Sequence, residues 1–494
     1  MTRRHFWGGA LWTVGGYAAV QAMRLGFNLA LARMVAPKAF GVMALVNLVI
    51  LGLQMLSDLG IRQCVVRHAR GADPDFLNTA WTVQVVRGAI LWLIAALLAW
   101  PIAVVYGEPD LLWLVPLAGS AAFVGGFTST AVFTLSREAN RGPLVRREVG
   151  VFAVTIALVL TALTTMHHWV PAESHVAAQL AVIAGGAVFS AVGEVALSYT
   201  LPSVSRPRFA WDGDAGGHLV GFGGWVLVST ACTFAAAQAD RLVIGVLSLE
   251  TLGVYHIAWV LAMLPPLLAS ALGYHLLFPR LASALRDGEP LATAFDRAHR
   301  VLTLFAGWMV TGAVCLGPAF IGLLYDDRYR DAAGYIQLLS VTAWVTAFLL
   351  PGEFALLALG RPRSLAVGQG VRLAFLPAFL WVGYSLAGID GLILGTAAGE
   401  LVRYLVIARF LAGVGVNVLG VDLGRTVAAI GIVLGYRVAQ PVLFAGFCPL
   451  LQPLAEGIAL TAVWAALAAA DSGGSVAATL CRVASRRQAQ GVAR

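Results

Sequence analysis

Long apolar segments recur along almost the whole chain and are separated by short polar turns. Each segment has the length of about 20 residues that an α-helix needs to cross the hydrocarbon core of a bilayer. Pro and Gly residues mark the turns, for example Pro37, Gly107 and Pro202. The pattern predicts an all-α, polytopic membrane protein with about 14 transmembrane helices. The predicted segments are 8–33, 39–59, 77–104, 111–136, 148–170, 176–200, 218–246, 252–278, 299–323, 333–358, 364–386, 389–411, 422–446 and 451–470.

The composition agrees with this pattern. Of the 494 residues, 59% are hydrophobic and 12% are charged, whereas a soluble domain carries roughly 25% charged residues. The 54 glycines suit closely packed membrane helices. The five cysteines are isolated from one another, so the sequence predicts neither a metal site nor a disulfide framework.

The arginines indicate the orientation of the chain. Most of them fall in alternate loops, and the loops between hold only a few cations, such as Arg33, Lys38 and Arg328. Because cations accumulate on the cytoplasmic side, this asymmetry predicts an even number of spans with both termini cytoplasmic. The net charge of +8 is therefore explained by topology, and we expect no nucleic-acid partner. The predicted outer loops are too short for an external catalytic domain, so we expect no enzyme.

A weak internal repeat predicts the domain organisation. Asn28 precedes Gly41 by the same spacing as Asp240 precedes Gly253, and in both places the glycine opens the next helix. Two pseudo-symmetric six-helix bundles would explain this match, although a chain rich in Gly, Leu and Val can also produce it by coincidence. The predicted parts are an N-terminal bundle over 1–200, a cytoplasmic linker over 201–217, a C-terminal bundle over 218–411, a peripheral helix pair over 412–470 and a basic cytoplasmic tail over 471–494.

A polar stripe interrupts the first apolar segment. Arg24 lies inside this segment, with Gln21 and Asn28 one turn away on the same helical face. A charge inside the bilayer is costly and usually faces a cavity or a partner. The planar guanidinium of an arginine can bind two phosphate oxygens at once. The stripe therefore indicates a cavity wall that binds a phosphate or a sugar, or else a cluster of hydrogen bonds between helices.

Other charges inside predicted spans form the remaining candidates. Asp240 and Arg241 are candidates for substrate binding, and Asp240 could also pair with a cation of the other half or bind a coupling proton or sodium ion. Glu400 lies three residues before Arg403, which favours a pair on one helical face, and it is also a candidate for ion coupling. Glu353 has no partner nearby in sequence, which makes it a candidate for proton coupling.

Two more arginines lie in the cytoplasmic halves of their spans. Arg87 and Arg372 either extend to the membrane interface or line the mouth of an inward-facing cavity.

Several short motifs, in this order and on these spans, resemble those of Wzx-type polysaccharide flippases for O-antigen or exopolysaccharide. These flippases belong to the multidrug/oligosaccharidyl-lipid/polysaccharide transporter superfamily. The motifs are Gly15 to Arg33, Val35 to Val42, Ser57 to Ile61, Gln238 to Gly245 and Leu252 to Tyr255.

The resemblance implies two helical bundles around a central cavity that work by alternating access, with the last two spans as peripheral additions. It implies a bacterial inner-membrane protein that translocates a polyprenyl-diphosphate-linked oligosaccharide for exopolysaccharide, O-antigen or capsule biosynthesis. Such a protein needs no cofactor, although H+ or Na+ could drive it. A polysaccharide polymerase and export machinery would be its protein partners.

Three alternatives remain open on the sequence. A cation-coupled multidrug exporter of the same superfamily would need an acidic cavity, in which Arg24 would repel the drug. A membrane-embedded glycan polymerase or glycosyltransferase would need a long outer loop that carries catalytic residues. A scaffold in a glycan-assembly complex would tolerate alanine at Arg24 and Asp240.

Overall fold

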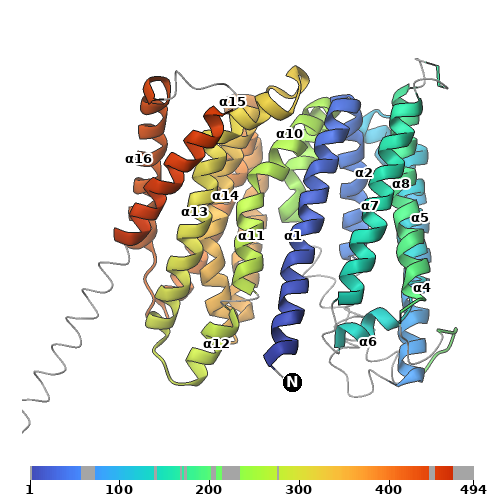
Figure 1. Ribbon diagram of the computed structural model, residues 1–494, viewed down its shortest axis with the longest axis horizontal. Helices are drawn as coiled ribbons and strands as arrows, with labels where there is room; N and C mark the ends of the chain where they lie inside the picture. Colours follow the sequence, from blue (N-terminus) through green and yellow to red (C-terminus); the bar gives the residue numbers. More distant parts are fainter. Residues whose placement is uncertain are drawn as a thin grey trace, which may run out of the picture. The chain divides into compact units, whose positions relative to one another are not determined.

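A computed structural model provides the fold (Figure 1). It describes residues 3–56, 73–137, 142–166, 170–171, 175–201, 207–213, 234–274, 278–443 and 451–470, with the backbone alone for residues 3–18. The motif from Ser57 to Ile61, most of the predicted linker, the first part of the span predicted over 218–246 and the tail 471–494 lie outside these residues.

The described part of the chain is built of helices, and none of it forms a strand. Ten helices are long and apolar enough to cross a membrane, which confirms the prediction of an all-α polytopic membrane protein. The total of about 14 spans stays a prediction. The helices are α1 (Arg3–Met34), α2 (Pro37–Leu56), α4 (Pro74–Tyr106), α5 (Leu111–Gly125), α6 (Ala131–Arg137), α7 (Gly142–Thr165), α8 (His175–Ser198), α10 (Leu249–Ala262), α11 (Leu264–Leu272), α12 (Phe278–Arg286), α13 (Leu291–Leu324), α14 (Ala332–Ala358), α15 (Pro362–Ala412) and α16 (Leu419–Leu443), with further helical residues at 234–247 and Gln452–Ala470.

Helix α15 contains two of the predicted spans. Its backbone leaves the helical region at Ala387 and at Gly388, where φ is +59°. A positive φ favours glycine because it has no Cβ. The turn falls between the segments predicted over 364–386 and 389–411, so the chain reverses there with almost no loop.

One predicted span is interrupted. The segment predicted over 111–136 forms α5 and α6, separated at residues 126–130. The Gln84 side chain of α4 donates from Nε2 to the carbonyl oxygens of Gly125 at 3.3 Å and Gly126 at 2.8 Å. Backbone groups freed inside a membrane need such partners, so the amide of Gln84 stabilises the end of α5.

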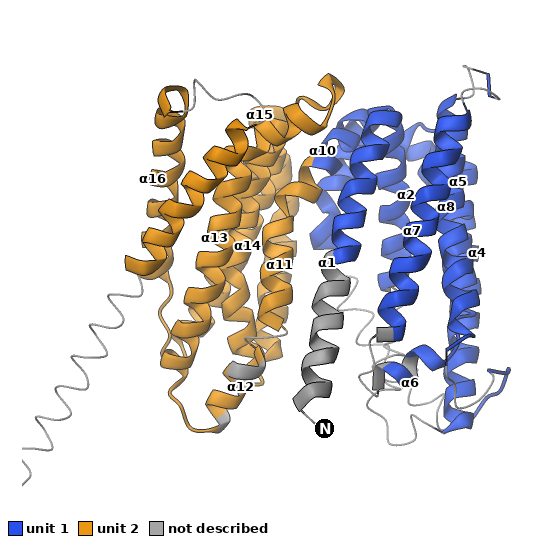
Figure 2. Ribbon diagram, in the orientation of Figure 1, with its two compact units in different colours: residues 1–257 blue, residues 258–494 orange. Residues whose placement is uncertain are grey.

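The chain forms two compact units, Met1–Ile257 and Ala258–Arg494 (Figure 2). In the first unit, α5 packs against α4 and α8, and α7 packs against α1 and α8. In the second unit, α14 packs between α13 and α15. Helix α10 begins in the first unit and ends in the second. The linker over 201–217 and the bundle boundaries drawn from the repeat stay predictions.

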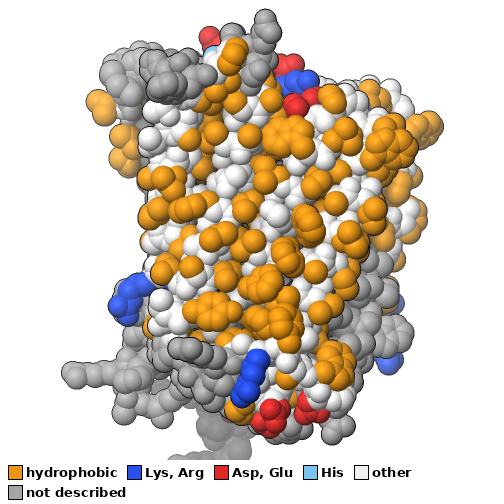
Figure 3. All heavy atoms as spheres, turned by 90° about the vertical axis from the view of Figure 1, so that its right-hand side faces the viewer, with side chains coloured by type: hydrophobic (Ala, Val, Ile, Leu, Met, Phe, Trp, Pro, Cys, Tyr) orange, Lys and Arg blue, Asp and Glu red, His pale blue; other side chains and the backbone are white. Residues whose placement is uncertain are grey.

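Figure 3 shows a face of the first unit that is covered by hydrophobic side chains. The charged side chains visible there lie toward the two ends of the helices. Helix α4 of this unit exposes the apolar side chains of Leu93, Leu97 and Trp100. A continuous apolar surface of this kind suits contact with lipid.

Two glycines of the internal repeat pack helix against helix. A Cβ at Gly41 of α2 would lie 1.7 Å from the carbonyl oxygen of Leu249, and one at Gly253 of α10 would lie 2.1 Å from the carbonyl oxygen of Pro37. Pro37 and Leu249 are the first residues of the two helices. The contact is therefore reciprocal, as a two-fold axis between equivalent helices requires. This geometry supports the repeat that the spacing in the sequence suggests.

We expect Gly41→Ala and Gly253→Ala each to lower stability by about 1–3 kcal/mol, because a methyl group must force the two helix starts apart. The melting temperature of the purified protein in detergent measures the loss. Gly26→Ala is the matched control, since a Cβ at Gly26 meets nothing within 4 Å. A Gly41→Ala variant as stable as Gly26→Ala would contradict the close packing.

Candidate functional site

Arg24 is a cation of α1 that is bonded to no acid among the described residues. It lies within α1, its side chain is exposed, and its Cζ lies 6.0 Å from the centroid of the Phe152 ring of α7. Among the described residues no carboxylate or carbonyl accepts a hydrogen bond from it. A cation over an aromatic face is attracted only weakly at an exposed site. The guanidinium donors of Arg24 are therefore available to an external anion.

The surroundings of Arg24 agree in part with the predicted polar stripe. Gln21 and Asn28 lie one turn on either side of Arg24 and are partly exposed. Phe27, between them, packs edge-on against Phe152, with ring centroids 6.4 Å apart. The Phe152 ring thus contacts both an aromatic and a cationic side chain of α1, which restricts where the arginine can lie.

Arg87 makes a hydrogen bond that the sequence did not reveal. Its Nη2 donates to the backbone carbonyl of Gln54 at 2.9 Å, in the last turn of α2. Arginines often bond carbonyls left free at a helix C-terminus. Arg87 therefore stabilises the end of α2, and its partly exposed side chain remains a candidate for the cavity mouth.

Arg372 and the two predicted coupling carboxylates meet in one network. Glu400 accepts from Arg372 at 3.0 Å and from Arg403 at 3.4 Å. Arg403 also pairs with Glu353 of α14. The same-face pair of Glu400 and Arg403 agrees with the sequence, whereas the partner of Glu353 comes from a neighbouring helix. The lack of a local partner was therefore no guide to the surroundings of Glu353.

This network balances two cations against two anions. Arg372 and Glu400 are buried, and Arg403 and Glu353 are nearly so. Removing one charge from a buried pair leaves the other uncompensated, at a large cost. A proton on either carboxylate would therefore weaken the hold on an arginine and release its donors.

Asp240 and Arg241 are both buried in the helical residues 234–247. Tyr255 of α10 donates from its hydroxyl to Oδ2 of Asp240. This bond joins the two helices on either side of the turn at Ser248. Among the described residues, the bond to the carboxylate of Asp240 comes from a tyrosine, and pairing with a cation of the other half stays a prediction.

A second polar cluster has no counterpart in the sequence analysis. His299 of α13 accepts at Nδ1 from Arg425 at 3.0 Å, and its Nε2 lies 2.8 Å from Oδ1 of Asp422. Tyr404 donates to the other oxygen of Asp422 at 2.6 Å. Because Nδ1 accepts, the ring proton lies on Nε2, toward the carboxylate. The cluster joins α16 to α13 and α15 through groups that sequence alone places near span ends.

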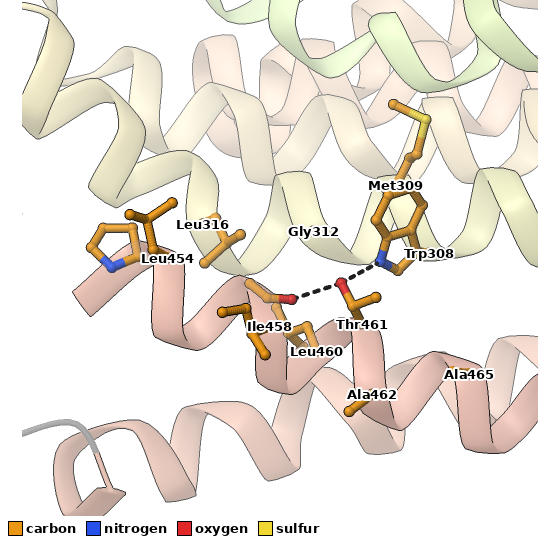
Figure 4. A pocket seen from close by; sticks show the side chains of 12 residues that line it. Trp308, Met309, Gly312, Leu316, Leu454, Ile458, Leu460, Thr461, Ala462 and Ala465 are labelled. Carbon is orange, nitrogen blue, oxygen red and sulfur yellow. Dashed lines mark hydrogen bonds between the residues drawn. The ribbon is translucent and has the colours of Figure 1, made fainter. Parts of the chain in front are cut away.

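An apolar groove of about 750 Å³ runs between α13 and the helix Gln452–Ala470 (Figure 4). Met309, Leu316, Leu454 and Ile458 are among its lining residues. Among the side chains that line it, polar atoms come from Trp308 and Thr461, which bond each other at 3.2 Å. Its chemistry suits a hydrocarbon chain and excludes a diphosphate.

Comparison of the sequence with known proteins identifies a family that matches most of the chain. The family described as "Polysaccharide biosynthesis protein" matches residues 30–334. The lipopolysaccharide biosynthesis protein WzxC of Escherichia coli (strain K12) is 24% identical over 401 residues, which is 80% of this chain and 78% of WzxC. The teichuronic acid biosynthesis protein TuaB of Bacillus subtilis (strain 168) is 19% identical over 309 residues, 62% of each chain.

Solved structures share the fold. The lipid II flippase MurJ in an inward closed conformation superposes with a TM-score of 0.70 at 10% identity, over 94% of this chain and 99% of MurJ. An inward-facing multidrug resistance MATE family transporter of the MOP superfamily superposes with a TM-score of 0.61 at 14% identity, over 80% of this chain and 95% of the transporter. The match of residues 30–334 confirms the polysaccharide biosynthesis family that the motifs suggested, and the two solved structures show that the chain shares the fold of a flippase and a transporter.

We expect Arg403→Gln to destabilise the protein by about 3 kcal/mol, because Glu353 and Glu400 would then share fewer cations in a poorly hydrated site. A double-mutant cycle with Glu353→Gln, read from unfolding in detergent, measures the coupling. The double variant should lose less stability than the sum of the single variants. Strict additivity would show that the Glu353–Arg403 pair contributes nothing.

Proposed function

The chain belongs to the polysaccharide biosynthesis protein family, and we propose that it is a flippase for polyprenyl-diphosphate-linked oligosaccharide. It would move this lipid from the cytoplasmic to the periplasmic leaflet of a bacterial inner membrane by alternating access. Both termini would lie in the cytoplasm. The glycan would then serve exopolysaccharide, O-antigen or capsule biosynthesis, with a polymerase and export machinery as partners.

The proposal rests on the charge of Arg24 and on its surroundings. Its charge lies within α1, a helix that the sequence predicts to span the membrane, and no described carboxylate bonds it. An arginine in the bilayer needs a counter-charge or water, and here a substrate can supply the counter-charge. A diphosphate fits because its oxygens accept two parallel hydrogen bonds from one guanidinium.

The other parts of the substrate also find suitable chemistry. The polar stripe with Gln21 and Asn28 provides hydrogen-bonding groups for sugar hydroxyls beside Arg24. The groove along α13 is apolar and fits a polyprenyl tail. Translocation needs no covalent step, so no catalytic residue is required.

The charge network of α14 and α15 supports ion coupling. Protonation of Glu400 or Glu353 would weaken the bonds of Arg372 and Arg403. Each of these two arginines could then donate to an anionic ligand, the role that we propose for Arg24. Proton uptake by a carboxylate would in this way be coupled to binding of the diphosphate by an arginine. Asp240 is an alternative site for the coupling H+ or Na+.

We expect Arg24→Ala to reduce transport at least about tenfold, since a charge-assisted hydrogen bond contributes about 1.5–3 kcal/mol. Proteoliposomes with a fluorescent polyprenyl-diphosphate oligosaccharide measure arrival at the far leaflet. Arg24→Lys keeps the positive charge but loses the planar guanidinium that binds two oxygens at once. Its transport rate should lie between those of the wild type and Arg24→Ala. Arg330→Ala, at an exposed outer turn, is the control and should transport normally.

Equal transport by wild type and Arg24→Ala, at equal amounts of folded protein, would remove Arg24 from the mechanism. Absence of movement of every lipid-linked sugar tested, under both a proton and a sodium gradient, would contradict the flippase and favour an exporter or a scaffold.

A further inference from the structure

Glu456 is a carboxylate held at the centre of a helix contact. It belongs to the membrane helix Gln452–Ala470 and is 0% exposed. Its Oε2 accepts from the hydroxyl of Tyr436 at 2.7 Å. Its Oε1 accepts from the amides of Gln440 at 3.2 Å and Gln452 at 2.9 Å. All three donors are neutral.

Among the described residues, no cation bonds this carboxylate directly. Within the described residues no Arg, Lys or His nitrogen lies within 4.0 Å of Glu456, whereas Glu194 binds Arg147 at 2.8 Å and Glu400 binds Arg372 at 3.0 Å. Arg437 is adjacent to Tyr436 in sequence, but its Nη2 donates to Gln337 at 3.3 Å. A buried carboxylate without a cation is costly in a medium of low dielectric.

We propose that Glu456, Tyr436, Gln440 and Gln452 form a binding site for a monovalent cation, with Na+ as the physiological ligand. The four side chains contain carboxylate, phenol and amide oxygens, the ligands that hard cations prefer. The oxygen and nitrogen of a glutamine amide exchange places when the amide turns over. After such a turn, both amides offer oxygen next to Oε1 of Glu456.

The distances suit a shared ion. The two amide atoms lie 2.9 and 3.2 Å from Oε1 of Glu456. Oxygens at right angles around a hard cation lie about 3.4 Å apart when metal–oxygen distances are about 2.4 Å. A small outward movement of the glutamines would therefore make room for the ion.

The charge of the site selects the class of ion. One carboxylate neutralises one positive charge, so a monovalent ion leaves the site neutral. The described residues contain no cluster of three or more His, Cys, Asp or Glu side chains that could hold a metal ion. A divalent ion would thus bring excess charge into the membrane.

The site is separate from the transport residues considered above. It joins the helix Gln452–Ala470 to α16, while Arg24 lies on α1 and Glu353 on α14. Ion binding at Glu456 would stabilise the contact between these two last helices. The inference does not rest on the flippase proposal, because binding is measured without substrate.

The test is thermal unfolding of the full-length protein in detergent, in NaCl and in choline chloride at equal ionic strength and constant pH. We expect Na+ to raise the melting temperature by a few degrees in a saturable manner. Glu456→Gln should abolish the rise in melting temperature with Na+. Tyr436→Phe should increase the Na+ concentration at which half of the maximal rise is reached. Glu194→Gln, which alters a carboxylate bound to Arg147, should respond as the wild type does.

Two results would overturn the proposal. One is an equal Na+ response in wild type and Glu456→Gln, which would place the ion elsewhere. The other is a melting temperature that depends on pH but not on Na+, K+ or Li+, which would make Glu456 a proton site or a purely structural acceptor. If Glu456→Gln does not fold, an unchanged response in Tyr436→Phe also counts against the site.

Discussion

A charge within the bilayer must meet an opposite charge, and this constraint governs the polar interior of the protein. Arg147 binds Glu194 between α7 and α8, and Arg403 binds Glu353 between α15 and α14. Because leaving one member of a buried pair alone is costly, these contacts fix which helices lie together. Among the described residues, Arg24 is bonded to no acid, and Glu456 is bonded to neutral donors alone. These two residues are the ones for which we propose ligands of opposite charge.

The course of the helices was predictable because it depends on length and hydropathy alone. A stretch of about 20 apolar residues must be helical in a membrane, whatever its neighbours are. Hence α14 and α16 begin and end within a few residues of the segments predicted over 333–358 and 422–446. The repeat around Gly41 and Gly253 was also visible, since close helix packing requires small residues at fixed positions.

Contacts between helices were not predictable to the same degree. Glu400 and Arg403 were recognised as a pair because three residues bring side chains together on one helix. Arg403 also bonds Glu353, but that contact depends on how α14 packs against α15. The same holds for His299 and Asp422, which join α13 and α16. Sequence spacing carries no information on such neighbours, because they come from different helices.

The fold itself leaves the substrate open. The same architecture occurs in a lipid II flippase and in a multidrug transporter, at 10% and 14% identity, so the choice between these classes rests on local charge. A cationic drug would approach Arg24 against its field, whereas a diphosphate would be drawn to it. Near Glu353 and Glu400 each acid is already bonded to an arginine, which leaves little negative charge for a cationic drug. The balance of charges among the described residues is therefore the observation that favours an anionic ligand over a cationic drug.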